Sequence, residues 1–188
     1  MWVLASASPR RKEILERLGI SFRVRVLHTQ EVSDCVAPAD RVQDLALQKA
    51  LQVAQVEPDV PILAADTVVF SGGILEKPKD EADHYRMLKH LSGRIHDVYT
   101  GIAVITPDWT ETAFEKTKVH FRTLSETEIR TYIASRDGSD KAGGYGIQGL
   151  GMLLVERIEG DFFNVMGLPV VRWFGLCRDH SFPLVEGW

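Results

Sequence analysis

The sequence predicts an α/β fold in which helices flank a mixed central sheet. Apolar, β-branched stretches typical of strands alternate with amphipathic stretches typical of helices, and some predicted strands follow one another with no helix between them. The chain has 188 residues, enough for one substantial core. We therefore expect a single domain over residues 1–188, with two lobes around a cleft.

In the first half of the chain, strands and helices alternate. Pro9 begins the first helix with Ser8 as its N-cap, and Gly19 ends it. A second helix begins at Pro38, and its apolar residues recur at the spacing of one helix face. That stripe consists of Val42, Leu45, Ala46, Ala50 and Val53. The predicted strands are residues 2–5, 22–27 and 62–70.

In the second half, helix starts are the clearest signals. Asp80 caps a third helix, and a capping box of Ser125 and Glu128 begins a fourth. Pro169 begins the last helix. The glycine-rich residues 141–151 are predicted to form a loop. The predicted strands are residues 95–105, 110–121 and 152–158.

Composition and charge exclude several classes of function. The formal net charge is −4 and no long basic run occurs, so we expect no nucleic acid polymer as a partner. The two cysteines, Cys35 and Cys177, form no CxxC motif, which argues against a disulfide framework or a cysteine zinc site. No secretory signal and no apolar run of about 18 residues, the length of a membrane span, is found. We therefore expect a cytoplasmic protein with no membrane partner.

Residues 6–11, SASPRR, place hydroxyls and two arginines around the start of the first helix. The helix dipole disfavours cations at a helix N-terminus, by about 0.3–1 kcal/mol each. A bound anion would reverse that penalty, and backbone amides, hydroxyls and guanidinium groups together form a phosphate site. The structural alternative, in which Arg10 and Arg11 point to solvent, is equally compatible with this segment alone.

Two charged residues interrupt apolar patterns. Lys49 lies within the apolar stripe of the second helix, where it must extend to the surface, pair with a carboxylate or meet a ligand. Extension to the surface satisfies the periodicity at least as well as the other two. Asp66 lies inside the apolar strand 62–70, where an unpaired carboxylate is expensive to bury. For Asp66 a functional role is favoured over a structural one at a strand boundary.

The glycine-rich segment KAGGYGIQGLG at 141–151 is a further candidate. Glycines let a backbone approach a ligand closely, and Gln148 carries both a donor and an acceptor, as recognition of a base edge requires. The spacing matches neither a Walker loop nor a dinucleotide-binding turn, and a flexible surface loop is the structural alternative. Glu31 and Lys77 are weaker candidates, because most such residues in polar segments are solvated. Glu31 would join Asp66 at one divalent ion if the fold brings them together.

Taken together, these segments resemble the Maf family. The matches follow the family's order and span nearly the whole chain, which makes the set much more specific than any single segment. They comprise LASASPRR (4–11), QKA (48–50), ADT (65–67), KPKD (77–80), LSGR (91–94), KAGGYGIQG (141–149) and residues 161–169.

The resemblance implies a mixed α/β fold similar to that of the inosine-triphosphate pyrophosphatases, with a cleft between two lobes. It implies hydrolysis of a nucleoside triphosphate between the α- and β-phosphates, a divalent metal cation (Mg or Mn) and often a homodimer. The residues resemble the branch that acts on dTTP and UTP. The branch that acts on 7-methyl-GTP usually has a different residue in place of Arg10 and differs at Thr67 and Gln148.

The resemblance also implies roles for individual residues. Asp66 is the expected proton acceptor and, with Glu31, the expected metal ligand. Four cations are expected to neutralise the charge of the triphosphate and of the leaving pyrophosphate: Arg10, Arg11, Lys49 and Lys77. The loop 27–34 departs from the family pattern, so Asp34 stays open as an alternative to Glu31. The residues expected to bind substrate are Ser6, Ser8, Arg10, Arg11, Thr67 and Gln148.

Two other functions stay open from the sequence. One is a regulator of cell division that senses a nucleotide without turning it over, since the family has been associated with septum formation. Against it stands the full set of charged positions, because a sensor needs no proton acceptor. The other is an enzyme that acts on modified pyrimidine nucleotides and only tolerates UTP.

Overall fold

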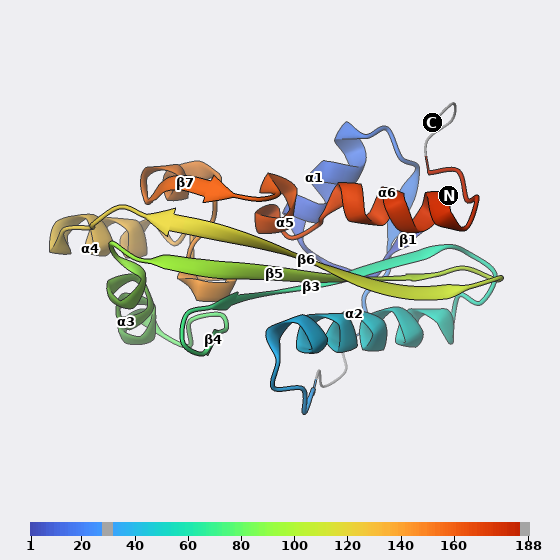
Figure 1. Ribbon diagram of the computed structural model, residues 1–188, viewed down its shortest axis with the longest axis horizontal. Coiled ribbons are helices and arrows are strands. Elements are labelled where there is room, and N and C mark those ends of the chain that lie inside the picture. Colours follow the sequence, from blue (N-terminus) through green and yellow to red (C-terminus); the bar gives the residue numbers. More distant parts are fainter. Residues whose placement is uncertain (28–31, 185–188) are drawn as a thin grey trace. The chain divides into compact units, whose positions relative to one another are not determined.

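The computed structural model describes residues 1–27 and 32–184 (Figure 1). Its strands are β1 (Trp2–Leu4), β2 (Phe22–Val24), β3 (Ile62–Phe70), β4 (Ile74–Leu75), β5 (Ile95–Ile105), β6 (Thr110–Phe121) and β7 (Val155–Glu159). Its α-helices are α1 (Pro9–Arg17), α2 (Pro38–Ala54), α3 (Glu81–Leu91), α4 (Glu126–Ser135), α5 (Phe162–Met166) and α6 (Val170–Asp179). Two short 3-10 helices are η1 (Ala142–Gly144) and η2 (Gly149–Leu153).

The strands form one seven-stranded mixed sheet. Its order is β2-β1-β3-β5-β6-β7, and β4 pairs with β3 off this path. β1 runs parallel to both β2 and β3, whereas the pairs β3–β4 and β6–β7 are antiparallel. The predicted α/β class with a mixed sheet and flanking helices is therefore confirmed.

The chain divides into two compact units. The first comprises the described residues of Met1–Asp66, Thr100–Glu115 and Gly167–Trp188, and the second comprises Thr67–Tyr99 and Lys116–Met166. The boundaries fall within β3, β5 and β6, so each of these strands contributes residues to both units.

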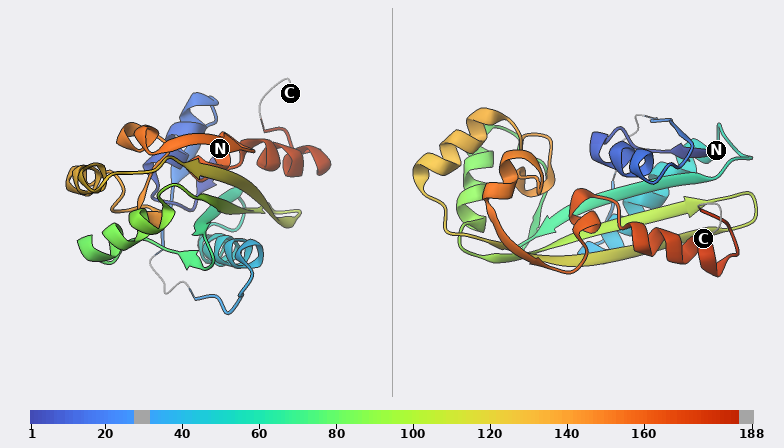
Figure 2. Two further views of the ribbon diagram at one scale, coloured as in Figure 1. Left: turned by 60° about the vertical axis from the view of Figure 1, so that its left-hand side comes forward. Right: turned by 90° about the horizontal axis from the view of Figure 1, so that it is seen from above.

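In the first unit, helices cover both faces of the sheet. α2 lies on one face and α1 and α6 lie on the other (Figure 1; Figure 2, right). The predicted apolar stripe of α2 is buried, and its Ala46 and Val53 belong to one core with Ile62 and Ala64 of β3. Because side chains alternate along a strand, Asp66 shares the face of β3 that carries Ile62 and Ala64. That face is the one covered by α2.

Gly101 of β5 allows α2 to lie directly on the sheet. A Cβ at Gly101 would lie only 2.3 Å from the carbonyl carbon and oxygen of Val42 in α2. No side chain fits in that space, so glycine is required for the close approach of the two backbones.

The second unit has its own core, built from helices and the ends of long strands. Leu88 of α3 and Ile129 of α4 are fully buried there, beside Phe121 of β6. Tyr145 from the glycine-rich segment belongs to the same core. The glycine-rich segment is therefore anchored in the interior of this unit.

Most predicted elements agree with the structure, and the differences concern short segments. The strands at 62–70, 95–105 and 110–121 have the predicted limits. The predicted strand 22–27 ends at Val24, and the predicted strand 152–158 begins only at Val155, because the preceding residues wind into η2. β4 and α5 escaped prediction because segments of two and five residues carry too little periodicity.

The helix starts follow the sequence signals, with one qualification. Asp80 accepts the Asp83 N–H at 2.7 Å, and Ser125 and Glu128 form the predicted capping box. Ser8 occupies the N-cap position of α1, but its side chain makes no capping hydrogen bond. Among the described residues, no helix combines the length and the apolar character needed to cross a membrane.

Candidate active site

The candidate residues of the first unit lie on segments that follow or flank the paired strands β1 and β3. Leu4 pairs with Leu63, and the Ala5 N–H donates to the Leu63 carbonyl at 2.8 Å. Beyond this point the chain leaves β1 toward α1, while β3 continues to Asp66. In α/β sheets, ligands bind outside the carboxyl ends of parallel strands, because loops and helix N-termini meet there.

Arg11 is held by the protein itself. Its Nε donates to the carbonyl of Gly167 at 2.7 Å, and its Nη1 donates to Ser6 Oγ at 2.8 Å. The same Ser6 hydroxyl also accepts the Ser8 N–H at 3.3 Å, and Ser6 is buried. Arg11 therefore ties the segment before α1 to the chain before α6. No sequence pattern predicts the partner Gly167, which lies 156 residues away along the chain.

Arg10 contrasts with its neighbour. Its half-buried guanidinium makes no hydrogen bond or ion pair within residues 1–27 and 32–184. The first turn of α1 holds no acidic residue, and Ser8 does not cap it. An uncompensated cation thus lies at the positive end of a helix, and a phosphate oxygen would stabilise both.

Lys49 and Asp66 form an ion pair between α2 and β3. Lys49 Nζ donates to Asp66 Oδ1 at 2.6 Å, and the two side chains are only 18% and 16% exposed. Of the three options for Lys49, pairing with a carboxylate is therefore the one observed. The other carboxylate oxygen of Asp66 makes no hydrogen bond to any residue that the structure describes.

Three predicted site residues belong to the second unit. Thr67 follows Asp66 in β3, and alternation places its side chain on the opposite face of that strand. Lys77 is exposed between β4 and α3. Gln148 is half-buried at the start of η2, and its side chain makes no hydrogen bond to a described residue.

The second carboxylate is not located by the structure. Glu31 lies outside the described residues, and its alternative Asp34 is exposed. Among the described residues, no cluster of three or more histidine, cysteine, aspartate or glutamate side chains could hold a metal ion. A magnesium ion, however, is commonly held by one or two carboxylates together with substrate phosphates. The free oxygen of Asp66 is compatible with such a site.

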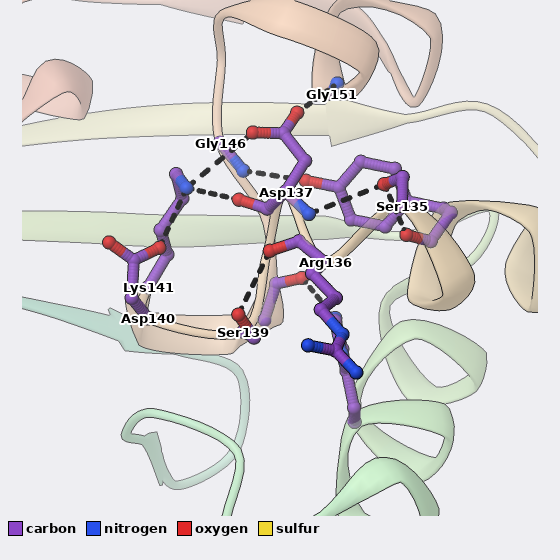
Figure 3. A network of polar contacts seen from close by, with 11 residues as sticks. Ser135, Arg136, Asp137, Ser139, Asp140, Lys141, Gly146 and Gly151 are labelled. Carbon is purple, nitrogen blue, oxygen red and sulfur yellow. Dashed lines mark hydrogen bonds and ion pairs between the residues drawn. The ribbon is translucent and has the colours of Figure 1, made fainter.

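The glycine-rich segment is folded, which argues against the flexible-loop alternative. Residues 143–147 are buried, and the Gly146 N–H donates to the Tyr132 hydroxyl at 3.1 Å (Figure 3). Gly143 and Gly144 adopt positive φ angles of 69° and 73°, which glycine tolerates best. Gln148 therefore projects from an ordered segment.

One family of proteins matches this chain over nearly its whole length. The family described as Maf-like protein matches residues 1–180. The chain belongs to the Maf family.

Several relatives within this family are close in sequence. A protein of Bacillus thuringiensis named dTTP/UTP pyrophosphatase is 48% identical over 172 residues, covering 90% of each chain. A Bacillus cereus protein of the same name is 49% identical, again covering 90% of each chain. Among solved structures, the Staphylococcus aureus Ham1 protein is similar over 64% of this chain and 71% of its own, with a TM-score of 0.48 and 15% identity.

Proposed function

We propose that this chain hydrolyses dTTP and UTP to the nucleoside monophosphate and pyrophosphate. The observation that carries the proposal is the Lys49–Asp66 pair, which holds a carboxylate in place within a largely apolar strand. The relatives named dTTP/UTP pyrophosphatase support the substrate class.

In this reaction the oxygen of water attacks the α-phosphorus, and the bond from that phosphorus to the oxygen bridging to the β-phosphate breaks. Asp66 accepts the proton that the water loses, and pyrophosphate leaves with the electron pair of the broken bond. The Lys49 hydrogen bond fixes one Asp66 oxygen, which leaves the other to take the proton. Arg10 and Lys77 neutralise the negative charge of the phosphates. Their contacts strengthen as charge develops on the leaving pyrophosphate, and this stabilises the transition state.

A divalent cation, magnesium or manganese, completes the proposed site. Asp66 and Glu31 would hold it, with Asp34 as the alternative to Glu31. When bound, the ion shields the negative charge of the phosphates and of the leaving pyrophosphate. Asp66 fits this role because one of its oxygens makes no hydrogen bond within the described part of the chain, and the two lone pairs of that oxygen would allow it to meet both the ion and the attacking water.

Selectivity for the pyrimidine is assigned to Arg10, Thr67 and Gln148. The amide of Gln148 offers a donor and an acceptor, and no described residue occupies either. Ser6 and Ser8 support the phosphate end, and Arg11 does so through its hold on Ser6. We further propose that the enzyme works in the cytoplasm as a homodimer, without nucleic acid polymers, and removes unwanted or modified pyrimidine nucleotides.

The test is a pyrophosphate-release panel on the purified chain. dTTP, UTP, CTP, the purine triphosphates, 7-methyl-GTP and modified pyrimidine triphosphates are each supplied with magnesium, with manganese or with EDTA. We expect metal-dependent release concentrated on dTTP, UTP and their modified forms. A preference for 7-methyl-GTP would overturn the assigned selectivity. Nucleotide binding without any release would overturn the reaction and favour a sensor.

A further inference from the structure

Asp137 lies just outside the glycine-rich segment and contacts both of its ends. Its carboxylate Oδ2 accepts the Gly151 N–H at 3.3 Å, and its Oδ1 lies 3.5 Å from Lys141 Nζ (Figure 3). Its main-chain carbonyl also accepts a hydrogen bond from Lys141 Nζ. One residue thus joins position 141, where the segment begins, to position 151, where it ends.

The ammonium group of Lys141 is held by contacts with neighbouring residues. Its side chain is only 14% exposed, and its ammonium group also pairs with Asp140 Oδ1 at 2.7 Å. Three oxygens of this short stretch therefore surround the ammonium group. A lysine that bound the triphosphate would have to leave all three, whereas a lysine that shapes the segment keeps them.

The glycines beside Gln148 fit closely against these two side chains. A Cβ at Gly146 would lie 3.0 Å from Lys141 Cε, and a Cβ at Gly149 would lie 2.8 Å from Asp137 Oδ2. Gln148 is thus flanked on one side by a glycine packed on Lys141 and on the other by a glycine packed on Asp137. The backbone that carries Gln148 has little freedom while both contacts are made.

We propose that Asp137 and Lys141 are positioning residues that set nucleobase selectivity by fixing the segment that carries Gln148. The inference rests on the proposed function, because it takes Gln148 as the residue that meets the base. A rigid support keeps a hydrogen-bonding side chain in its productive geometry, and a loose support weakens the discrimination that depends on that geometry.

The experiment compares kcat and KM for dTTP and CTP in Lys141→Met, which keeps the apolar stem and removes the charge. We expect the dTTP/CTP ratio of kcat/KM to fall about tenfold, mainly through KM for dTTP. Asp137→Asn, which keeps the shape, is expected to give a smaller change of the same sign. Ser139→Ala is the matched control: its hydroxyl donates to the Arg136 carbonyl in the same turn and makes no hydrogen bond with either positioning residue.

A double-mutant cycle separates positioning from general stability. In a Gln148→Ala background, Lys141→Met should change the ratio by less than about twofold, because the side chain it positions is already absent. A uniform loss of rate for both nucleotides, with an unchanged ratio, would overturn the proposal.

Amide hydrogen exchange tests whether Lys141 fixes the glycine-rich segment, and it does not require a measurement of enzyme activity. In Lys141→Met we expect the Gly146 and Gly151 amides to exchange at least about tenfold faster than in the wild type. Unchanged exchange there would overturn the positioning role even in an inactive protein. A wild type that releases no pyrophosphate from dTTP or UTP would instead overturn the proposed function, so the two failures are distinct.

Discussion

Lys49 of α2 donates a hydrogen bond of 2.6 Å to Asp66 of β3. The contact follows from two periodicities. Lys49 belongs to the helix face that also carries Ala46 and Val53, and Asp66 belongs to the strand face that also carries Ile62 and Ala64. Since these two faces pack together, the ammonium group of Lys49 and the carboxylate of Asp66 lie within hydrogen-bonding distance. The pair therefore serves the packing of the fold and the candidate chemistry at once.

The Lys49–Asp66 ion pair should contribute to the stability of the fold. Lys49→Met leaves a mostly buried carboxylate without its donor, so we expect the free energy of unfolding to fall by about 1–3 kcal/mol. The double variant Lys49→Met/Asp66→Asn should recover part of that loss, because no unpaired carboxylate remains. Urea unfolding of the wild type, both single variants and the double variant measures the coupling. Strictly additive losses would show that the two side chains do not depend on each other.

Asp66→Asn should abolish turnover while the nucleotide still binds. The substitution keeps the shape of the side chain and removes the proton acceptor, so kcat should fall roughly 100- to 10,000-fold. Pyrophosphate release measures the rate, and calorimetric titration with a dTTP analogue that resists cleavage between the α- and β-phosphates measures binding. Retention of most of the wild-type rate would remove Asp66 from the role of proton acceptor.

Substitution of the two adjacent arginines by alanine should have different effects, one on substrate binding and the other on stability. Arg10 has no partner among the described residues, so Arg10→Ala should raise KM for dTTP at least about tenfold with little change in stability. Arg11 holds Gly167 and Ser6, so Arg11→Ala should lower the free energy of unfolding by about 1–3 kcal/mol. Thermal unfolding and steady-state kinetics on both variants test the contrast. Equal losses of stability in the two variants would contradict the assignment of a binding role to Arg10 and a structural role to Arg11.

The sequence was informative where a side chain contradicts its local pattern. Lys49 in an apolar stripe and Asp66 in an apolar strand were both found in this way, and the structure pairs them. The acceptor of Arg11 could not be predicted, because a main-chain carbonyl such as that of Gly167 leaves no mark on the sequence. Asp137 escaped notice for a related reason. An aspartate after a helix is an ordinary turn residue, and only the folded chain brings its side chain to both ends of the glycine-rich segment that follows it.

Gly101 should be intolerant of even one added methyl group. Because its Cβ would lie 2.3 Å from the Val42 backbone, Gly101→Ala must push α2 away from β5. We expect a loss of about 1–3 kcal/mol in the free energy of unfolding, and a lower kcat because α2 carries Lys49. Gly175→Ala in α6 is the matched control: a Cβ there meets nothing within 4 Å, so this helix should be unchanged or stabilised. Similar losses in both variants would argue against a specific α2 contact.

The buried His96 should make stability depend on pH in the mildly acidic range. It is 3% exposed, its Nε2 lies 2.6 Å from the Tyr145 hydroxyl oxygen, and burial lowers its pKa to about 4. An unfolded histidine has a pKa of about 6.5, so between these values the unfolded chain binds a proton that the folded chain does not. This contribution, of the order of 3 kcal/mol, is therefore complete above about pH 6.5 and is lost progressively as the pH falls toward 4.

His96→Phe should flatten this pH dependence, since it keeps a ring beside Phe121 and Tyr145 but removes the titrating group. Tyr145→Phe is the control, because it removes the same hydrogen bond and leaves the imidazole in place. Glu128, whose hydrogen bonds from Ser125 and Arg122 lower its pKa to about 2, loses its charge only in more acidic solution. Urea unfolding of the wild type and both variants at pH values from 7 to 5 therefore gives the contribution of His96 as a difference in the pH dependence of stability. If His96→Phe and Tyr145→Phe show equal slopes over that range, the imidazole is not the group that titrates.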